Sequence, residues 1–186
     1  MARKQTPSAH VMVDLETLGV NPYAPIMSLA LVEFDPWGKG SGSEFVAGVT
    51  LESALKYGRI DASTLTWWFS AERDVARAAW MDLEQEDLEN VLFGVIEWFR
   101  VLNQHGVCVW GNGATFDNVI LSSAFTATGY DKPWGYGSDR CFRTLKNLSK
   151  VKPPKFEGTE HDPLHDARHQ VAWLQKIVKH EGLKVL

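Results

Sequence analysis

"HVMVDLETLG" (residues 10–19) decides the fold, because it reads as an apolar strand that ends on two acids. Side chains alternate between the two faces of an extended strand, so Asp14 and Glu16 share one face and Val13 and Leu15 share the other. Burying two unpaired carboxylates is costly, and each raises the pKa of the other unless a cation compensates them. The pair therefore indicates either a solvated strand end or a site for a positively charged group.

Length and composition suit one compact domain. The chain has 186 residues, is 45% hydrophobic and contains 8 Trp, so we expect a single domain over residues 1–186. No apolar run approaches the ~20 residues that span a bilayer, and the basic N-terminus lacks the apolar core of a signal peptide. Cys108 and Cys141 are too few for a disulfide scaffold. We therefore expect a reduced, cytoplasmic protein without a membrane partner.

The elements that follow are typical of an α/β layer fold with a mixed sheet. Further strands are expected at residues 26–35, 42–50 and 106–112. Expected helices lie at residues 61–80 (short ones), 83–104, 116–129, 140–150 and 164–181. Asp82 and Gln85 are a candidate cap pair for the helix over 83–104.

Three segments place an acid where a metal site needs one. Besides Asp14 and Glu16, Asp117 opens the helix after the strand at 106–112, and Asp166 opens the final helix. Carboxylate oxygens without a nearby Cys favour Mg²⁺ or Mn²⁺ over zinc. Two such ions ~3.5–4 Å apart can hold the attacking and leaving oxygens of a phosphodiester. Taken singly, Asp117 and Asp166 are better explained as helix-capping residues, so the joint pattern carries the hypothesis.

These acids lie in segments that resemble a known family. "VDLETLG" (13–19), "WGNGATFDNVIL" (110–121) and "HDPLHDA" (161–167) resemble, in order and spacing, the three motifs of the DEDD exonucleases. These are the proofreading-type (DnaQ-like) 3′–5′ exonucleases, and His161, five residues before Asp166, marks the DEDDh branch. The resemblance implies a ribonuclease H-like α/β fold, a five-stranded mixed sheet flanked by helices. "TLTWWFSAE" (64–72) and "RCFRTL" (140–145) further resemble phage and prophage exonucleases of this branch.

The resemblance also implies roles for individual residues. It assigns two Mg²⁺ or Mn²⁺ ions to four carboxylates, those of Asp14, Glu16, Asp117 and Asp166. It makes His161 the general base that deprotonates the attacking water, since a His with an unperturbed pKa near ~6.5 is largely neutral at working pH. His165 is a rival base. Its spacing does not match the motif, and on a helix it points away from Asp166.

Single-stranded DNA or RNA with a free 3′ end is the implied partner. The expected substrate contacts are Thr17, Leu18, Gly19, Trp68, Phe116, Asn112 and Arg140. Trp67, Trp68 and Phe116 offer stacking surfaces for unpaired bases, although we expect one of the two tryptophans to pack in the core. Asn112 and Asn118 flank the Asp117 motif as hydrogen-bonding partners.

A run of basic residues lies near the third motif. Residues 140–155 carry six bases and no acid, although the net charge of the chain is −4. Such a run is either a solvated helix face or a local site for a phosphate backbone.

The sequence therefore predicts a metal-dependent 3′–5′ exonuclease that releases 5′-mononucleotides. The phage-like motifs favour DNA, and an exoribonuclease with the same site is the alternative. An aspartate-nucleophile phosphatase needs Asp in place of Glu16, and an RNase H-like endonuclease does not need His161. A non-catalytic nucleic-acid-binding domain needs none of the five candidate catalytic residues. The sequence leaves the oligomeric state open, with a homodimer among the alternatives.

Overall fold

The computed structural model describes residues 9–102 and 106–184. The strands are β1 (Ala9–Thr17), β2 (Ile26–Phe34), β3 (Glu44–Val49), β4 (Gln85–Glu86), β5 (Val107–Gly111) and β6 (Asp139–Cys141). The helices are α1 (Leu51–Tyr57), α2 (Ala62–Trp68), α3 (Asp74–Asp82), α4 (Leu88–Leu102), α5 (Asp117–Thr128), α6 (Phe142–Leu148) and α7 (Pro163–Glu181), with a 3₁₀ turn at Ala71–Arg73. The basic N-terminal residues 1–8 lie outside the described residues.

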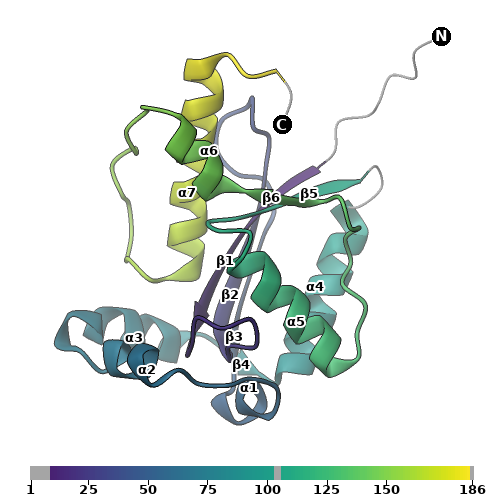
Figure 1. The fold of residues 1–186 in the computed structure, drawn as a ribbon, viewed down its shortest axis with the longest axis vertical. Helices are drawn as coiled ribbons and strands as arrows, with labels where there is room; N and C mark the ends of the chain where they lie inside the picture. The colour runs from purple at the N-terminus through teal and green to yellow at the C-terminus, as the bar shows by residue number, and fades with distance from the viewer. Residues whose placement is uncertain (1–8, 103–105, 185–186) are drawn as a thin grey trace.

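Within the described ranges, one mixed sheet carries helices on both faces (Figure 1). Its strand order is β4-β3-β2-β1-β5-β6. β2 pairs antiparallel with β1 and β3, whereas β1–β5, β5–β6 and β3–β4 are parallel. The expected α/β architecture is confirmed, with six strands in this sheet in place of five.

Two helices begin later than expected, because short strands precede them. α4 begins at Leu88, since residues 85–86 pair with β3 as the edge strand β4. Asp82 ends α3, so the pair of Asp82 and Gln85 does not cap α4. α6 begins at Phe142 and not at residue 140, since β6 pairs with β5. Residues 103–104 of the helix expected over 83–104 lie outside the described ranges.

The alternation along β1 separates two apolar cores. Val13 and Leu15 pack with α4 and α5 on one face of the sheet. Met12 packs with α7 on the other face, and Figure 1 shows α7 on the side of the sheet opposite α4. Asp14 and Glu16 follow Met12 on the α7 face, as the period of two predicts.

A smaller apolar cluster attaches α2 and α3 to the carboxyl end of β1. Leu18, just after β1, is buried with Met27, Trp68 and Ala76. This contact places α2 beside the strand end that carries the two acids. None of the described helices combines the length and apolar character that a membrane crossing requires.

Candidate active site

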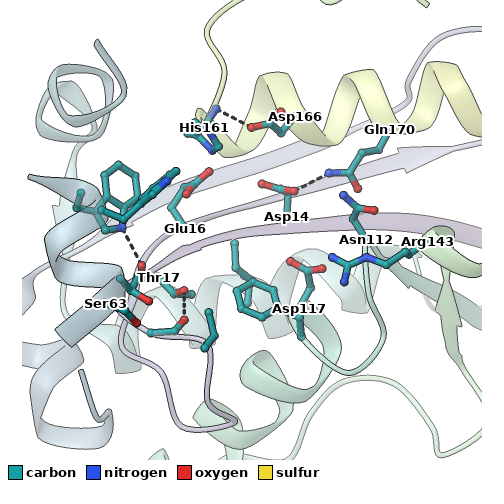
Figure 2. A pocket seen from close by; sticks show the side chains of 17 residues that line it. Asp14, Glu16, Thr17, Ser63, Asn112, Asp117, Arg143, His161, Asp166 and Gln170 are labelled. Carbon is teal, nitrogen blue, oxygen red and sulfur yellow. Dashed lines mark hydrogen bonds between the residues drawn. The ribbon is translucent and has the colours of Figure 1, made fainter. Parts of the chain in front are cut away.

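β1 presents Asp14 and Glu16 to a cleft of about 540 Å³ (Figure 2). Both side chains are buried, and Asp14 Oδ1 accepts a hydrogen bond of 2.6 Å from Gln170 Nε2 on α7. The pairing of β1 with β2 shifts register between Glu16 and Thr17. The extra residue at this shift is Met27 of β2, and a bulge bends the strand that contains it. The regular register between β1 and β2 therefore ends directly after the second acid.

α5 brings Asp117 to the same cleft. Asp117 is the first residue of α5 and is buried. The helix starts very close to the end of β5: a Cβ atom on Gly111 would lie 2.9 Å from the Cβ of Asp117 and 2.3 Å from Oδ1 of Asn118. The position of Asp117 therefore depends on the absence of a side chain at residue 111.

α7 and the turn before it supply Asp166 and His161. Asp162 caps α7, because its carboxylate accepts two backbone N–H groups of the first turn, so helix capping does not account for Asp166. Asp166 Oδ2 instead accepts the backbone N–H of His161 at 2.8 Å. Glu16, His161 and Asp166 each offer one ligand atom, and these atoms all lie within 4.8 Å of one another. Figure 2 shows the three groups facing the cleft together.

Crowding of the acids changes their pKa values. Burial, with the neighbouring carboxylates, raises the pKa of Asp14 and that of Glu16 well above the usual range. Burial raises the pKa of Asp117 to about 7, against backbone hydrogen bonds and the charge of Arg143. Burial likewise raises the pKa of Asp166 to about 6. Four ionised carboxylates at this place therefore require additional positive charge.

The residues of the cleft fit a divalent metal ion. Its donors are carboxylate oxygens and one imidazole, and no Cys is among the lining residues, a set that suits Mg²⁺ or Mn²⁺. Arg143 is the one Lys or Arg side chain among the described residues that line the cleft. Even with Arg73 nearby, whose charge lowers the pKa of Glu16, the protein's own cations are too few to neutralise four acids.

The expected substrate contacts divide into two groups. Five of them line the cleft: Thr17, Gly19, Trp68, Phe116 and Asn112. Leu18 does not, because its side chain is buried against Trp68. Arg140 does not either, since it belongs to β6 and its guanidinium donates to the carbonyl of Gly137. Asn118 Nδ2 donates to the carbonyl of Val109, so it ties α5 to β5.

The two adjacent tryptophans have different environments. Trp68 is 3% exposed, and its indole N–H donates to the carbonyl of Thr17 at 2.9 Å. Trp67 is 36% exposed, and it meets the imidazole of His161 edge-on with ring centroids 4.9 Å apart. The guanidinium of Arg73 lies 4.2 Å from the centroid of the Trp67 ring. The expectation that one tryptophan packs in the core is confirmed for Trp68, and Trp67 offers the accessible ring.

His165 faces away from the cleft. Its Nδ1 lies 3.2 Å from Asp162 Oδ1 and accepts the backbone N–H of Thr159 at 3.3 Å. It lines a separate cavity with Lys155 and His169. The expectation that His165 points away from Asp166 is confirmed.

Five residues that line the cleft are not identified by sequence analysis, namely Val20, Ser63, Thr64, Arg143 and Gln170. Gln170 follows Asp166 by four residues, so helical spacing would have placed both on one face. Arg143 belongs to the basic run, but the sequence does not indicate which of its bases faces the cleft. Nothing in the sequence singles out Ser63.

One protein family matches almost the whole described chain. The model described as the 3′–5′ exoribonuclease Rv2179c-like domain matches residues 9–178. No curated protein matches the sequence.

Solved structures share the fold at low sequence identity. The nuclease domain of 3′hExo, a DEDDh family member bound to rAMP, has a TM-score of 0.62 at 13% identity, over 93% of this chain and 92% of that chain. E. coli exonuclease I in complex with a dA16 oligonucleotide has a TM-score of 0.64 at 17% identity, over 94% of this chain and 41% of that chain. Cell-death related nuclease 4 has a TM-score of 0.58 at 12% identity, over 93% of this chain and 64% of that chain. The ribonuclease H-like fold is thereby confirmed.

We expect the metal-free protein to lose stability as the pH rises from about 6.5 to about 8. The pKa values of Asp14, Glu16 and Asp117 are raised in the folded state, so the folded protein binds more protons than the unfolded chain and the free energy of unfolding falls. The histidines whose pKa values are lowered act with the opposite sign, but below their unfolded pKa of ~6.5. Urea unfolding in the presence of a chelator, at several pH values across this range, measures the slope of the free energy of unfolding against pH.

Mn²⁺ should flatten this pH dependence, because a cation that binds only the folded state favours ionised carboxylates. Asp14→Asn is the matched control: it removes one charge with little change of shape. It should stabilise the metal-free protein near pH 8 and weaken the response to Mn²⁺. A metal-free wild type whose stability does not change over this range would contradict the crowding of ionisable acids.

A side chain at residue 111 should disturb the site. Gly111→Ala places a Cβ against Asp117 and Asn118, so we expect a loss of ~1–3 kcal/mol in the free energy of unfolding and weaker Mn²⁺ binding by calorimetry. Gly137→Ala is the control, because a Cβ there meets no atom within 4 Å. Unchanged Mn²⁺ affinity in Gly111→Ala would show that the close approach does not position Asp117.

Proposed function

The chain belongs to the 3′–5′ exoribonuclease Rv2179c-like domain family, as a DEDDh 3′–5′ exonuclease of nucleic acids, and we propose that it shortens single-stranded RNA and releases 5′-mononucleotides. One observation carries the proposal: four carboxylates from β1, α5 and α7 meet His161 in a single cleft. DEDDh exonucleases use divalent metal ions, and the donor set described above fits such ions.

We assign the metal ions to the four carboxylates. Asp14, Glu16, Asp117 and Asp166 would hold two Mg²⁺ or Mn²⁺ ions, which supply positive charge for the attacking and leaving oxygens of the phosphodiester. Gln170 donates to Asp14 and thereby orients that carboxylate. The raised pKa values of the acids support this assignment, because the same crowding favours binding of a cation.

We assign the general base to His161. Burial and the charge of Arg73 lower the pKa of His161, so its imidazole is neutral near pH 7 and able to accept a proton. The edge contact with Trp67 holds the ring over Glu16 and Asp166. His161 takes a proton from water as the water oxygen bonds to phosphorus. The bond from phosphorus to the 3′ oxygen of the preceding nucleotide breaks, that oxygen takes a proton from water and becomes the new 3′-hydroxyl, and the terminal nucleotide leaves as a 5′-monophosphate.

The 3′-terminal nucleotide is assigned to the α2 side of the cleft. Thr17 Oγ1 donates to the carbonyl of Gly19 at 2.7 Å, and Trp68 donates to the carbonyl of Thr17. These bonds fix the backbone just beyond Glu16, where Ser63 and Thr64 also line the cleft. A backbone held in this way can act as a stop for the last nucleotide, which supports cleavage from a chain end over an endonuclease.

RNA is the first substrate that we propose, and DNA is the second. The family description names an exoribonuclease, whereas the phage-like motifs favour DNA. Among the described residues, the hydroxyl groups of Ser63 and Thr64 have no hydrogen-bond partner, and both residues line the cleft, so they are free to meet a 2′-OH. Discrimination between the two substrates depends on contacts of this kind.

Domain extent and location are also proposals. The family match over residues 9–178 supports one exonuclease domain spanning residues 1–186. Cys108 and Cys141 are both free thiols, which supports a reducing, cytoplasmic location.

The direct test uses strands labelled at the 5′ end. With Mg²⁺ or Mn²⁺, a labelled single-stranded RNA should shorten into a ladder from the 3′ end, and the released product should comigrate with 5′-mononucleotides. The matched DNA of equal sequence, assayed in parallel, should be degraded more slowly if the free hydroxyls favour a 2′-OH. Equal or faster cleavage of DNA would reverse the order of the two substrates.

Circular single-stranded RNA and DNA are the controls for direction. A circle offers no 3′ end, so it should stay intact while its linear counterpart is degraded. Cleavage of the circle would replace the proposal with an endonuclease.

The two histidines of the third motif should behave differently. His161→Ala leaves all four carboxylates in place, so it should keep Mn²⁺ and nucleic-acid binding while kcat falls by roughly 10²–10⁴-fold. The acid limb of the pH–rate profile should be absent in the His161→Ala variant. His165→Ala is the comparison, because His165 faces a separate cavity. This variant should lower kcat far less than His161→Ala does. The reverse result would mean that the motif is aligned wrongly.

A further inference from the structure

Arg143 places a cation at the edge of the cleft. It is exposed on the first turn of α6 and lines the cleft with Asn112 and Asp117. Its charge lowers the pKa of Asp117, yet among the described residues its guanidinium forms no hydrogen bond and no ion pair. Figure 2 shows the guanidinium directed toward the acids from the side opposite Thr17. A cation without a protein partner at this place is available to an anion of the substrate.

The turn before α5 keeps this guanidinium close to the cleft. Gly113 has φ of 142°, and a Cβ there would lie 3.2 Å from Cζ of Arg143. The absence of a side chain therefore leaves room for the guanidinium beside the backbone. This packing positions the cation without neutralising it.

Lys146 continues the positive charge one turn further along α6. Its ammonium lies 5.2 Å from the centroid of the Trp173 ring of α7, and the proximity of Arg143, after burial, lowers its pKa. No Asp or Glu occurs in the whole basic run 140–155. Arg143 and Lys146 repel each other in the free protein, and a bound polyanion reduces this repulsion.

The cleft therefore has two chemically different ends. At the α2 end, hydroxyl groups and the ring of Trp67 suit a sugar and a base. At the α6 end, Arg143 suits a phosphate, which a guanidinium can bind through two parallel hydrogen bonds. A strand whose last nucleotide occupies the α2 end must leave past the α6 end.

From this arrangement we propose that Arg143 binds the phosphate immediately 5′ to the scissile one, where the strand leaves the cleft past α6. The inference rests on the proposed exonuclease function and adds the path of the substrate. It also gives a role to the basic run, which the catalytic residues do not use.

The first test measures binding without turnover. Fluorescence anisotropy of a labelled single-stranded RNA in Ca²⁺, at several salt concentrations, gives the slope of log Kd against log[salt]. Arg143→Ala should reduce the magnitude of that slope by ~0.7, the value for one phosphate contact on a single strand. Arg143→Lys should retain it. Arg100→Ala is the matched control, because Arg100 pairs with Glu97 on α4 and lines no part of the cleft.

The second test removes the proposed contact from the substrate. A neutral methylphosphonate replaces the phosphate just 5′ to the scissile bond, and KM should rise about tenfold for the wild type. Arg143→Ala should show a similar rise on the all-phosphate strand and no further rise on the modified one. A methylphosphonate several phosphates upstream should leave the effect of Arg143→Ala unchanged.

The two tests separate this inference from the proposed function. If the penalties of Arg143→Ala and of the methylphosphonate add independently, or if the salt slope is unchanged, Arg143 does not bind that phosphate and the inference is wrong. If even the wild type fails to shorten any strand, the proposed function is wrong. In that case the salt slopes still decide whether Arg143 contacts the backbone.

Discussion

Repulsion between buried carboxylates is the constraint on which the site depends. Asp14 and Glu16 lie two residues apart on one strand, and Asp117 and Asp166 approach them from helices on opposite faces of the sheet. Each group raises the free energy of the others when all are ionised. The scaffold tolerates this cost because two separate apolar cores hold β1 in place from both sides. Hydrophobic burial at Val13 and Met12 thus stabilises a site that is unfavourable by itself.

The sequence predicts the parts of this arrangement that follow from simple periods. A period of two places Asp14 and Glu16 on the face of Met12, and helical spacing places Ala167 and Val171 inward on α7. The order of three short motifs was sufficient to indicate the ribonuclease H-like fold. For the two periodic patterns, a residue's direction is set by its own element, so no knowledge of distant contacts is needed, whereas the fold was implied by the resemblance of the motifs to a known family.

The features that the sequence did not predict depend on contacts between elements. β4 has two residues, too few to produce a pattern, and it forms because β3 offers a parallel edge. Trp67 and Trp68 are adjacent in the sequence, which does not show that Trp68 is the one that packs against Leu18 and Met27. Arg140 and Arg143 are equivalent in the sequence. The pairing of β6 with β5 turns the first away from the cleft and leaves the second facing it.

The backbone of His161 has a consequence for the balance between stability and activity. Its φ of 63° is uncommon for a residue with a Cβ atom, and such conformations cost of order ~1–3 kcal/mol. The hydrogen bond from its N–H to Asp166 helps to maintain this conformation. Glycine would adopt it without that cost but would have no imidazole. Selection for thermal stability alone would therefore favour glycine at this position, which would remove the imidazole that we propose as the general base.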